Sequence, residues 1–311
     1  MDVEQHNARA ALRWLIDDGN VLASQLADAM SGYWEGRGMQ AEGTRWLKEV
    51  LESPLVLDLP TRAGLCRSMS NFKWMLGDFP SALTYAHQML AVWREADAQS
   101  NVAQALILMS QIHIEAGDCA QARDVALEAL RIGRVINDAD ATAGALLHLG
   151  EAELSLGEII QAETYFRESH ALCQAPDWHQ HVWLSLACKG LGEIALIRHE
   201  YDRAREFLLM GAERGVFVRL RLLNLVSLAG VIGTMPRRAT ADVQRAAKIW
   251  GATEALCEKV GTQLAPGNRM RIDALIAEAR TRIAPKTFAA AWAEGRELSL
   301  DEAIAVCLES V

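Results

Sequence analysis

The sequence is poor in several features that define common classes of protein. Only seven of its 311 residues are proline, and runs of β-branched residues are few, which argues against a β-rich fold. No apolar stretch approaches the roughly 20 residues that a membrane-spanning helix needs. Residues 1–20 carry charges where a secretory signal would be apolar. These absences predict a soluble, cytoplasmic and almost wholly helical chain with no membrane partner.

Basic residues are outnumbered by acidic ones. The chain has 31 Lys and Arg against 40 Asp and Glu, which gives a formal net charge of −9 at pH 7. Proteins that bind nucleic acid need clustered Lys and Arg to contact the phosphates. We therefore expect no nucleic acid to be bound by this chain itself.

The sequence also lacks the spacings of common metal and catalytic sites. Its six cysteines are scattered without a Cys-x-x-Cys pair, so reduced and mostly buried thiols are expected. Cys173, His179, His181 and Cys188 suggest a metal site, but they match no zinc module and Cys188 also takes a core position. No Ser/His/Asp or Cys/His arrangement supports catalysis. The sequence predicts a non-enzymatic chain without metal or cofactor.

What the sequence does contain is a phrase that recurs every 40 residues. It reads Gly-Asp/Glu-x-x-x-Ala and begins at Gly77, Gly117 and Gly157, with weaker copies at Gly38 and His199. A fixed period indicates a repeat architecture. Glycine can adopt the left-handed conformation that ends a helix, the acidic residue suits the start of the next helix, and alanine allows two helices to approach closely. The phrase therefore predicts a helical hairpin turn.

Segments of helical period flank each phrase. The expected pairs are 61–76 with 79–95, 98–116 with 119–136, 139–156 with 159–173, and 179–198 with 201–214. Other expected helices are 3–16, 19–36, 39–53, 216–233, 241–260, 267–283, 285–294 and 299–309. Ser299 and Glu302 form a candidate capping box. The expected fold class is all-α: a right-handed superhelical solenoid of helical hairpins. Its expected divisions are an N-terminal helix in 1–18, repeats over 19–260, clearest over 61–214, and a helical cap over 261–311.

The repeating unit resembles a known family. Small residues recur before the turn, as at Ser110, Gly150 and Gly192, and the alanine after the turn is followed by a further small or aromatic residue. This pattern is similar to the tetratricopeptide repeat, although the period is longer than the usual 34 residues. The resemblance implies hairpins that stack side by side and bind protein partners.

Both ends of the chain resemble a narrower group. His6–Trp14 is similar to the segment after the nucleotide-binding and winged-helix modules of LuxR-type, MalT-like bacterial transcriptional regulators in the signal-transduction ATPase class. Ala247–Ala255 and Phe288–Ala303 are similar to the end of their tetratricopeptide sensor region. The resemblance implies a sensor that receives a small-molecule inducer or a regulatory protein, with residues 1–18 linking it to an upstream module. Because the chain has no phosphate loop or helix-turn-helix, it is not itself the switch. The alternative is a stand-alone scaffold for partner peptides.

The first helix of each pair lines the concave face of a solenoid, which is its usual binding surface. The residue after the small position is polar in successive repeats. The candidate ligand-binding or peptide-binding residues are Arg67, Asn71, Trp74, Gln104, Gln111, Leu147, Glu151, Lys189 and Glu193. Arg67 and Lys189 would attract carboxylates and Trp74 would offer a flat contact. The alternative is an ordinary solvated face. A second copy of the chain is a further candidate partner.

The nine tryptophans raise the question of an aromatic cage. Most stand among apolar helical positions and are expected in the core; these are Trp14, Trp34, Trp46, Trp93, Trp250 and Trp292. Trp178 and Trp183, beside the two histidines, are harder to place.

Overall fold

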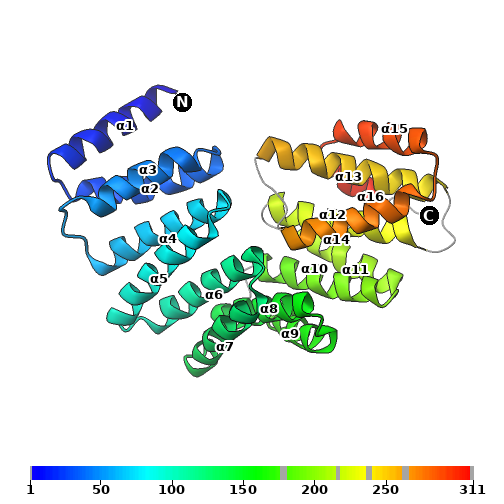
Figure 1. Ribbon diagram of the computed structural model, residues 1–311, viewed down its shortest axis with the longest axis horizontal. Helices are drawn as coiled ribbons and strands as arrows, with labels where there is room; N and C mark the ends of the chain where they lie inside the picture. Colours follow the sequence, from blue (N-terminus) through cyan, green and yellow to red (C-terminus); the bar gives the residue numbers. More distant parts are fainter. Residues whose placement is uncertain (1, 176–180, 215–217, 236–239, 261–265, 309–311) are drawn as a thin grey trace. The chain divides into compact units, whose positions relative to one another are not determined.

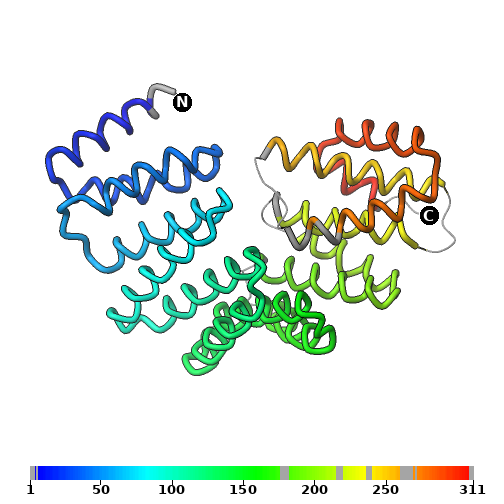
Figure 2. Tube along the Cα trace, viewed as in Figure 1, coloured from blue at the N-terminus to red at the C-terminus, as the bar shows by residue number. Residues whose placement is uncertain are grey.

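The computed structural model describes residues 2–175, 181–214, 218–235, 240–260 and 266–308 (Figure 1). Within these ranges every regular element is an α-helix, which confirms the all-α fold class. The chain divides into two compact units, Met1–Ala116 with Asp124–Ala141 and Gly117–Arg123 with Thr142–Val311. Both units are built from helices that pair as antiparallel hairpins, as the trace in Figure 2 shows for α4 and α5.

The helices end within three residues of the positions expected from the sequence. The first unit contains α1 (Asp2–Asp17), α2 (Leu22–Gly36), α3 (Gln40–Glu52), α4 (Leu59–Met75), α5 (Phe79–Glu95), α6 (Gln99–Ala116) and α7 (Cys119–Val135) from Asp124 on. The second contains α8 (Ala139–Leu156) from Thr142 on, α9 (Ile159–Leu172), α10 (His181–Ile197), α11 (Tyr201–Arg214), α12 (Val218–Thr234), α13 (Thr240–Val260), α14 (Pro266–Arg280), α15 (Pro285–Arg296) and α16 (Leu300–Leu308).

The recurring phrase forms the hairpin turns, as predicted. Gly77, Gly117 and Gly157 have φ values of 76°, 85° and 87°, the left-handed region in which glycine carries no steric penalty. After Gly77, the Asp78 side chain accepts a hydrogen bond from the Ser81 backbone N–H and caps α5. A hydrogen bond with the Ser81 side chain, followed by one from Lys73, lowers the pKa of Asp78.

The core of each unit lies between the two helices of a hairpin and between neighbouring hairpins. In the first unit Trp34, Leu47, Met69 and Phe72 are buried together. In the second unit the fully buried ring of Phe166 in α9 packs where Gly150 of α8 and Gly190 of α10 leave room for it. The burial of large residues against small ones explains why the helices approach so closely.

The last three helices pack on the final hairpin, α12 and α13. Helix α14 lies on α12, and α15 runs along α13 in close backbone contact. The Ser299 hydroxyl accepts from the Glu302 N–H, and the Glu302 carboxylate accepts from the Ser299 N–H, so the predicted capping box at α16 is confirmed. The two C-terminal stretches that resemble the regulators lie mostly on α13 and α15, the helices that face each other.

Most of the cysteine side chains are buried, as the sequence predicts. All six are free thiols, and Cys66, Cys173, Cys188 and Cys307 are buried. Burial in apolar surroundings raises the pKa of the Cys188 thiol to about 12. Within the described part of the chain, no helix is long and apolar enough to cross a membrane.

Candidate functional site

The predicted polar column lies on the first helix of each hairpin. Asn71 and Gln111 follow the buried residues Ser70 and Ser110, which face the second helix; the Ser70 hydroxyl donates to the Ala82 carbonyl at 2.9 Å. Glu151 and Glu193 hold the equivalent places after Gly150 and Gly192. The candidate residues divide between the two units: those up to Gln111 belong to the first and those from Leu147 on to the second.

In the first unit, α4 presents a basic and an amide side chain to solvent. Arg67 is exposed and forms no ion pair with the described residues, and Asn71, one turn later, is half-buried. The Asn71 amide has no hydrogen-bond partner in the described part of the chain. Trp74 is half-buried near the end of the same helix. This face therefore offers a cation, an amide and an aromatic ring within three turns.

Helix α6 continues the column with two glutamines that differ in their contacts. Gln104 donates to the Asp140 carboxylate at 3.0 Å, so its amide is already engaged within the first unit. Gln111 is half-buried and, among the described residues, has no hydrogen-bonded partner for its side chain. Asn71 and Gln111 are thus the two amides of the column that retain both donor and acceptor capacity.

In the second unit two of the candidates do not face solvent. Leu147 is fully buried and packs with Phe166, so it belongs to the core and not to an open face. Lys189 is 5% exposed and its ammonium lies 3.2 Å from the Glu193 carboxylate, which also accepts from the Ser227 hydroxyl at 3.2 Å. Burial leaves a charge stable only when it is paired. Lys189 therefore stabilises its own helix and is not available to a ligand carboxylate.

Glu151 also has an internal partner that the sequence did not suggest. The buried His148 ring lies 3.1 Å from the Glu151 carboxylate and stands edge-on to Trp183, with ring centroids 6.1 Å apart. His148 precedes Glu151 by three residues, the spacing of neighbours on one helix face. In the second unit the column is therefore a network of internal ion pairs and hydrogen bonds.

The suggested metal and aromatic sites can be compared with this arrangement. Cys173 and Cys188 are buried among apolar residues, whereas His179 and the side chain of His181 lie outside the described residues. No group of three or more metal-ligating side chains occurs in the ranges that the structure describes.

The tryptophans differ in their burial. Three are in the core as expected: Trp34, Trp46 and Trp250. Two are half-buried, Trp93 and Trp292, and Trp178 lies outside the described part. The expectation that Trp14 lies in the core is wrong, because its side chain is 62% exposed.

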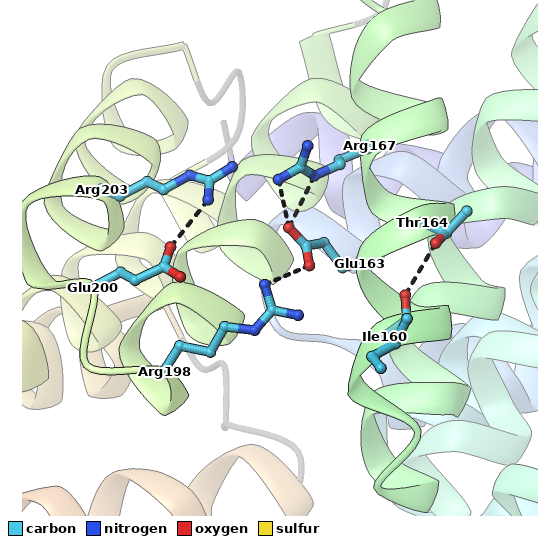
Figure 3. Close-up of polar contacts among 7 residues, drawn as sticks. All are labelled: Ile160, Glu163, Thr164, Arg167, Arg198, Glu200 and Arg203. Atoms are coloured by element: carbon cyan, nitrogen blue, oxygen red, sulfur yellow. Dashed lines mark hydrogen bonds and ion pairs between the residues drawn. The ribbon is translucent and has the colours of Figure 1, made fainter.

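A second charged cluster links α9 to the residues that follow α10 (Figure 3). Glu163 of α9 accepts hydrogen bonds from Arg167, one turn along the same helix, at 2.6 Å and pairs with Arg198, which follows α10, at 2.5 Å. Figure 3 shows the two guanidinium groups approaching one carboxylate from different elements. Burial raises the pKa of Glu163, but hydrogen bonds to Arg198 and Arg167 outweigh it, so the net pKa is lowered.

The Glu163 cluster predicts a pH dependence of stability. Because the folded pKa lies below the unfolded value of about 4.3, the contribution of Glu163 is fully present above that value and is lost as the pH falls through the folded pKa. We expect Glu163→Gln to lower the melting temperature at pH 7 and to flatten its decline between pH 5 and pH 3. Thermal melts followed by circular dichroism measure this, and an unchanged slope would show that the cluster contributes nothing.

Comparison with known proteins places the fold. Residues 63–134, which span α4 to α7, match the sequence model of the tetratricopeptide repeat. A search of curated proteins found no match. Among solved structures, a Rap protein complexed with Competence and Sporulation Factor is similar at a TM-score of 0.62 and 15% identity, over 88% of this chain and 77% of that one.

Two further solved structures share the fold. A tetratricopeptide repeat protein from Parabacteroides merdae has a TM-score of 0.60 and 14% identity, over 88% of this chain and 90% of that one. A signal transduction ATPase with numerous domains from Pyrococcus horikoshii, which carries a tetratricopeptide repeat sensor, has a TM-score of 0.53 and 16% identity. That similarity covers 88% of this chain and 44% of the longer protein. Residues 63–134 thus match the tetratricopeptide repeat, and the described helices share the fold of these helical repeat proteins.

Proposed function

We propose that the first unit binds an extended peptide segment of a partner protein along the exposed faces of α4 and α6. The observation that carries the proposal is the pair Asn71 and Gln111. They occupy equivalent positions 40 residues apart, they are half-buried, and no described residue hydrogen-bonds to either side-chain amide. A half-buried amide without an internal partner can donate to a peptide carbonyl and accept from a peptide N–H at the same time.

The neighbouring side chains define the chemistry of the peptide. Arg67 provides an exposed guanidinium that pairs well with a carboxylate, because its planar fork matches two carboxylate oxygens. Trp74 adds an aromatic face for an apolar side chain. We therefore favour a peptide with an acidic residue or a C-terminal carboxylate near an apolar residue. Gln104 adds to this face only if the ligand displaces Asp140.

We further propose that peptide binding is the sensing step of a bacterial regulator in the cytoplasm and that the chain itself catalyses no reaction. The support is the resemblance of both ends to LuxR-type, MalT-like regulators, together with a solved signal transduction ATPase whose repeats of this fold are a sensor. A stand-alone scaffold explains the peptide face equally well. The reading frame upstream of residue 1 separates the two, since a phosphate loop and a winged helix there favour the regulator and a stop codon favours the scaffold.

The peptide proposal is tested with a library of displayed 12-residue peptides, panned first on the wild-type protein and then on the double variant Asn71→Ala/Gln111→Ala. Losing two hydrogen bonds of about 1 kcal/mol each should weaken binding about 30-fold. The matched control, Gln121→Ala/Gln161→Ala, removes two exposed amides from second helices. It should leave binding unchanged. Selection of no peptide that depends on Asn71 and Gln111, with unaltered melts, would contradict the proposal.

A further inference from the structure

Helix α2 packs on α4 and brings an acidic side chain to the exposed faces of α4 and α6 that we propose bind a peptide, here called the peptide face. A side-chain atom added at Gly64 of α4 would lie 3.2 Å from a carboxylate oxygen of Asp28 in α2. Counting from Gly64, the candidate residues of α4 follow after three, seven and ten positions, the spacing of one helix face: Arg67, Asn71 and Trp74. The Asp28 carboxylate therefore lies against the peptide face.

Asp28 and Arg67 carry opposite charges that are paired neither with each other nor with any other described residue. Both residues are exposed, and neither forms an ion pair in the part of the chain that the structure describes. Elsewhere in the first unit, charges on neighbouring helices do pair, as Arg94 of α5 does with Glu128 of α7 at 2.8 Å. The peptide face therefore offers an available anion from α2 beside an available cation from α4.

The α2 side of the peptide face also has room for a ligand. Gly32 follows the buried Ser31 as Asn71 follows the buried Ser70, so Gly32 takes in α2 the place that Asn71 takes in α4. No atom lies within 4 Å of the position that a side chain at Gly32 would occupy. A peptide on α4 can therefore extend to Asp28, one turn earlier on α2, without meeting a side chain at Gly32.

We propose that Asp28 binds a cationic group of the peptide, which is a Lys or Arg side chain or the free amino terminus. The inference rests on the proposed function, because it adds a second charged position to the same peptide face. Gly64 and Arg67 are about 4.5 Å apart along the helix axis, and an extended peptide advances about 3.3 Å per residue. The basic and acidic groups of the peptide are therefore expected within two residues of each other, with the acidic group nearer to the apolar residue at Trp74.

Asp28 acts mainly on the choice of peptide. An exposed ion pair adds little to affinity, but a like charge in its place is repelled, so complementary charges discriminate between partners. A peptide with its two charges exchanged would bring a carboxylate to Asp28 and a cation to Arg67. We therefore expect the charge at position 28 to determine which peptides the face accepts.

The first test pans the displayed 12-residue peptides in parallel on the wild type, Asp28→Lys and Glu95→Lys. Glu95 is an exposed carboxylate on the second helix α5, so Glu95→Lys is a matched control that changes the charge of the first unit equally. We expect the wild type and the control to select a Lys or Arg within two residues of an Asp or Glu. Asp28→Lys should select an acidic residue in place of that basic one.

The second test measures a selected peptide by isothermal titration calorimetry on the wild type and on Asp28→Asn. Replacing the peptide's Lys by norleucine removes the charge and should weaken binding to the wild type about threefold to fivefold, the range of an exposed ion pair. Asp28→Asn should weaken the Lys peptide equally and leave the norleucine peptide unchanged. A loss that follows acetylation of the peptide's amino terminus instead would identify that amine as the bound cation.

Two results would overturn this inference and leave the proposed function standing, provided that binding still depends on Asn71 and Gln111. They are selection of the same peptides by the wild type and Asp28→Lys, or equal binding of the charged and uncharged peptides by the wild type. A lower melting temperature of Asp28→Asn with unchanged peptide preference would show that Asp28 pairs with Arg67 within the fold. If no selected peptide depends on Asn71 and Gln111, the proposed function fails and this inference fails with it.

Discussion

Phe166→Ala is expected to lower the free energy of unfolding of the second unit by about 3–5 kcal/mol, the usual cost of emptying a buried phenylalanine site. The ring is completely buried in α9 and contacts residues from α8 and α10. It fills the space that Gly150 and Gly190 leave open, and these two glycines have no side chain that could close the cavity. Urea unfolding followed by circular dichroism, with hydrogen exchange of α9 to isolate the second unit, measures the loss.

A double-variant cycle makes this prediction specific. A methyl group at Gly190 would lie 2.5 Å from the Phe166 ring, so Gly190→Ala alone should be destabilising. In the Phe166→Ala background the same methyl enters the cavity, and the combined loss should be clearly smaller than the sum of the two. Strict additivity would show that Gly190 and Phe166 do not share one packing site.

Gly251→Ala is expected to cost about 3 kcal/mol, at the upper end of the range for overpacked cores. A side chain at Gly251 of α13 would collide with the backbone carbonyl of Trp292 in α15, and one at Gly295 of α15 would collide with the carbonyl of Lys248 in α13. A flexible side chain could turn aside, but here the obstacle is backbone on both sides. The two helices must therefore separate to admit either methyl group. Thermal melts of Gly251→Ala and Gly295→Ala measure the effect.

The matched control for the glycine variants is Gly32→Ala in α2. No atom lies within 4 Å of the position that a side chain would take there, and the residue is helical. Alanine is favoured over glycine in a helix by up to about 1 kcal/mol, so this variant should be unchanged or slightly more stable. If Gly251→Ala behaved like Gly32→Ala, the close contact between α13 and α15 would not be a requirement of the fold.

The close contact gives a physical meaning to the C-terminal resemblance. Gly251 and Gly295 fall within the two stretches that resemble the end of the regulators' sensor region. Around them, Trp292 donates to Glu254 at 3.0 Å, and Arg296 pairs with Glu254 and Glu258, each at 2.6 Å. These residues hold α15 on the last hairpin. The two stretches that resemble the regulators therefore include residues that hold α15 against α13.

The helices and their pairing followed from the sequence because their causes are local. Gly77 and its equivalents take up a backbone conformation that other residues avoid, and the apolar period of 3.6 residues needs no distant partner to be recognised. The capping box at Ser299 and Glu302 spans three residues and was likewise foreseen. Helix ends and hairpin order thus depend on residues that are neighbours along the chain.

The candidate site depended on contacts that the sequence does not display. Asn71, Gln111 and Lys189 look alike as polar residues on first helices, yet Lys189 is buried against Glu193 and Ser227 while the two amides keep a half-exposed edge. Leu147 shares the register of Arg67 but is enclosed by Phe166. Periodicity assigns a residue to a face, and only the packing of the neighbouring helices decides whether that face is open.

The sequence by itself determined the all-α fold, the 40-residue hairpin and the column of polar positions, because each depends on the chain's own backbone preferences and spacing. The tertiary structure alone showed that the second-unit part of the column is closed by internal pairs, and that Trp14, a residue expected in the core, faces solvent. Burial is a property of what packs from outside a helix. A helix carries the same sequence pattern whether or not another helix covers it.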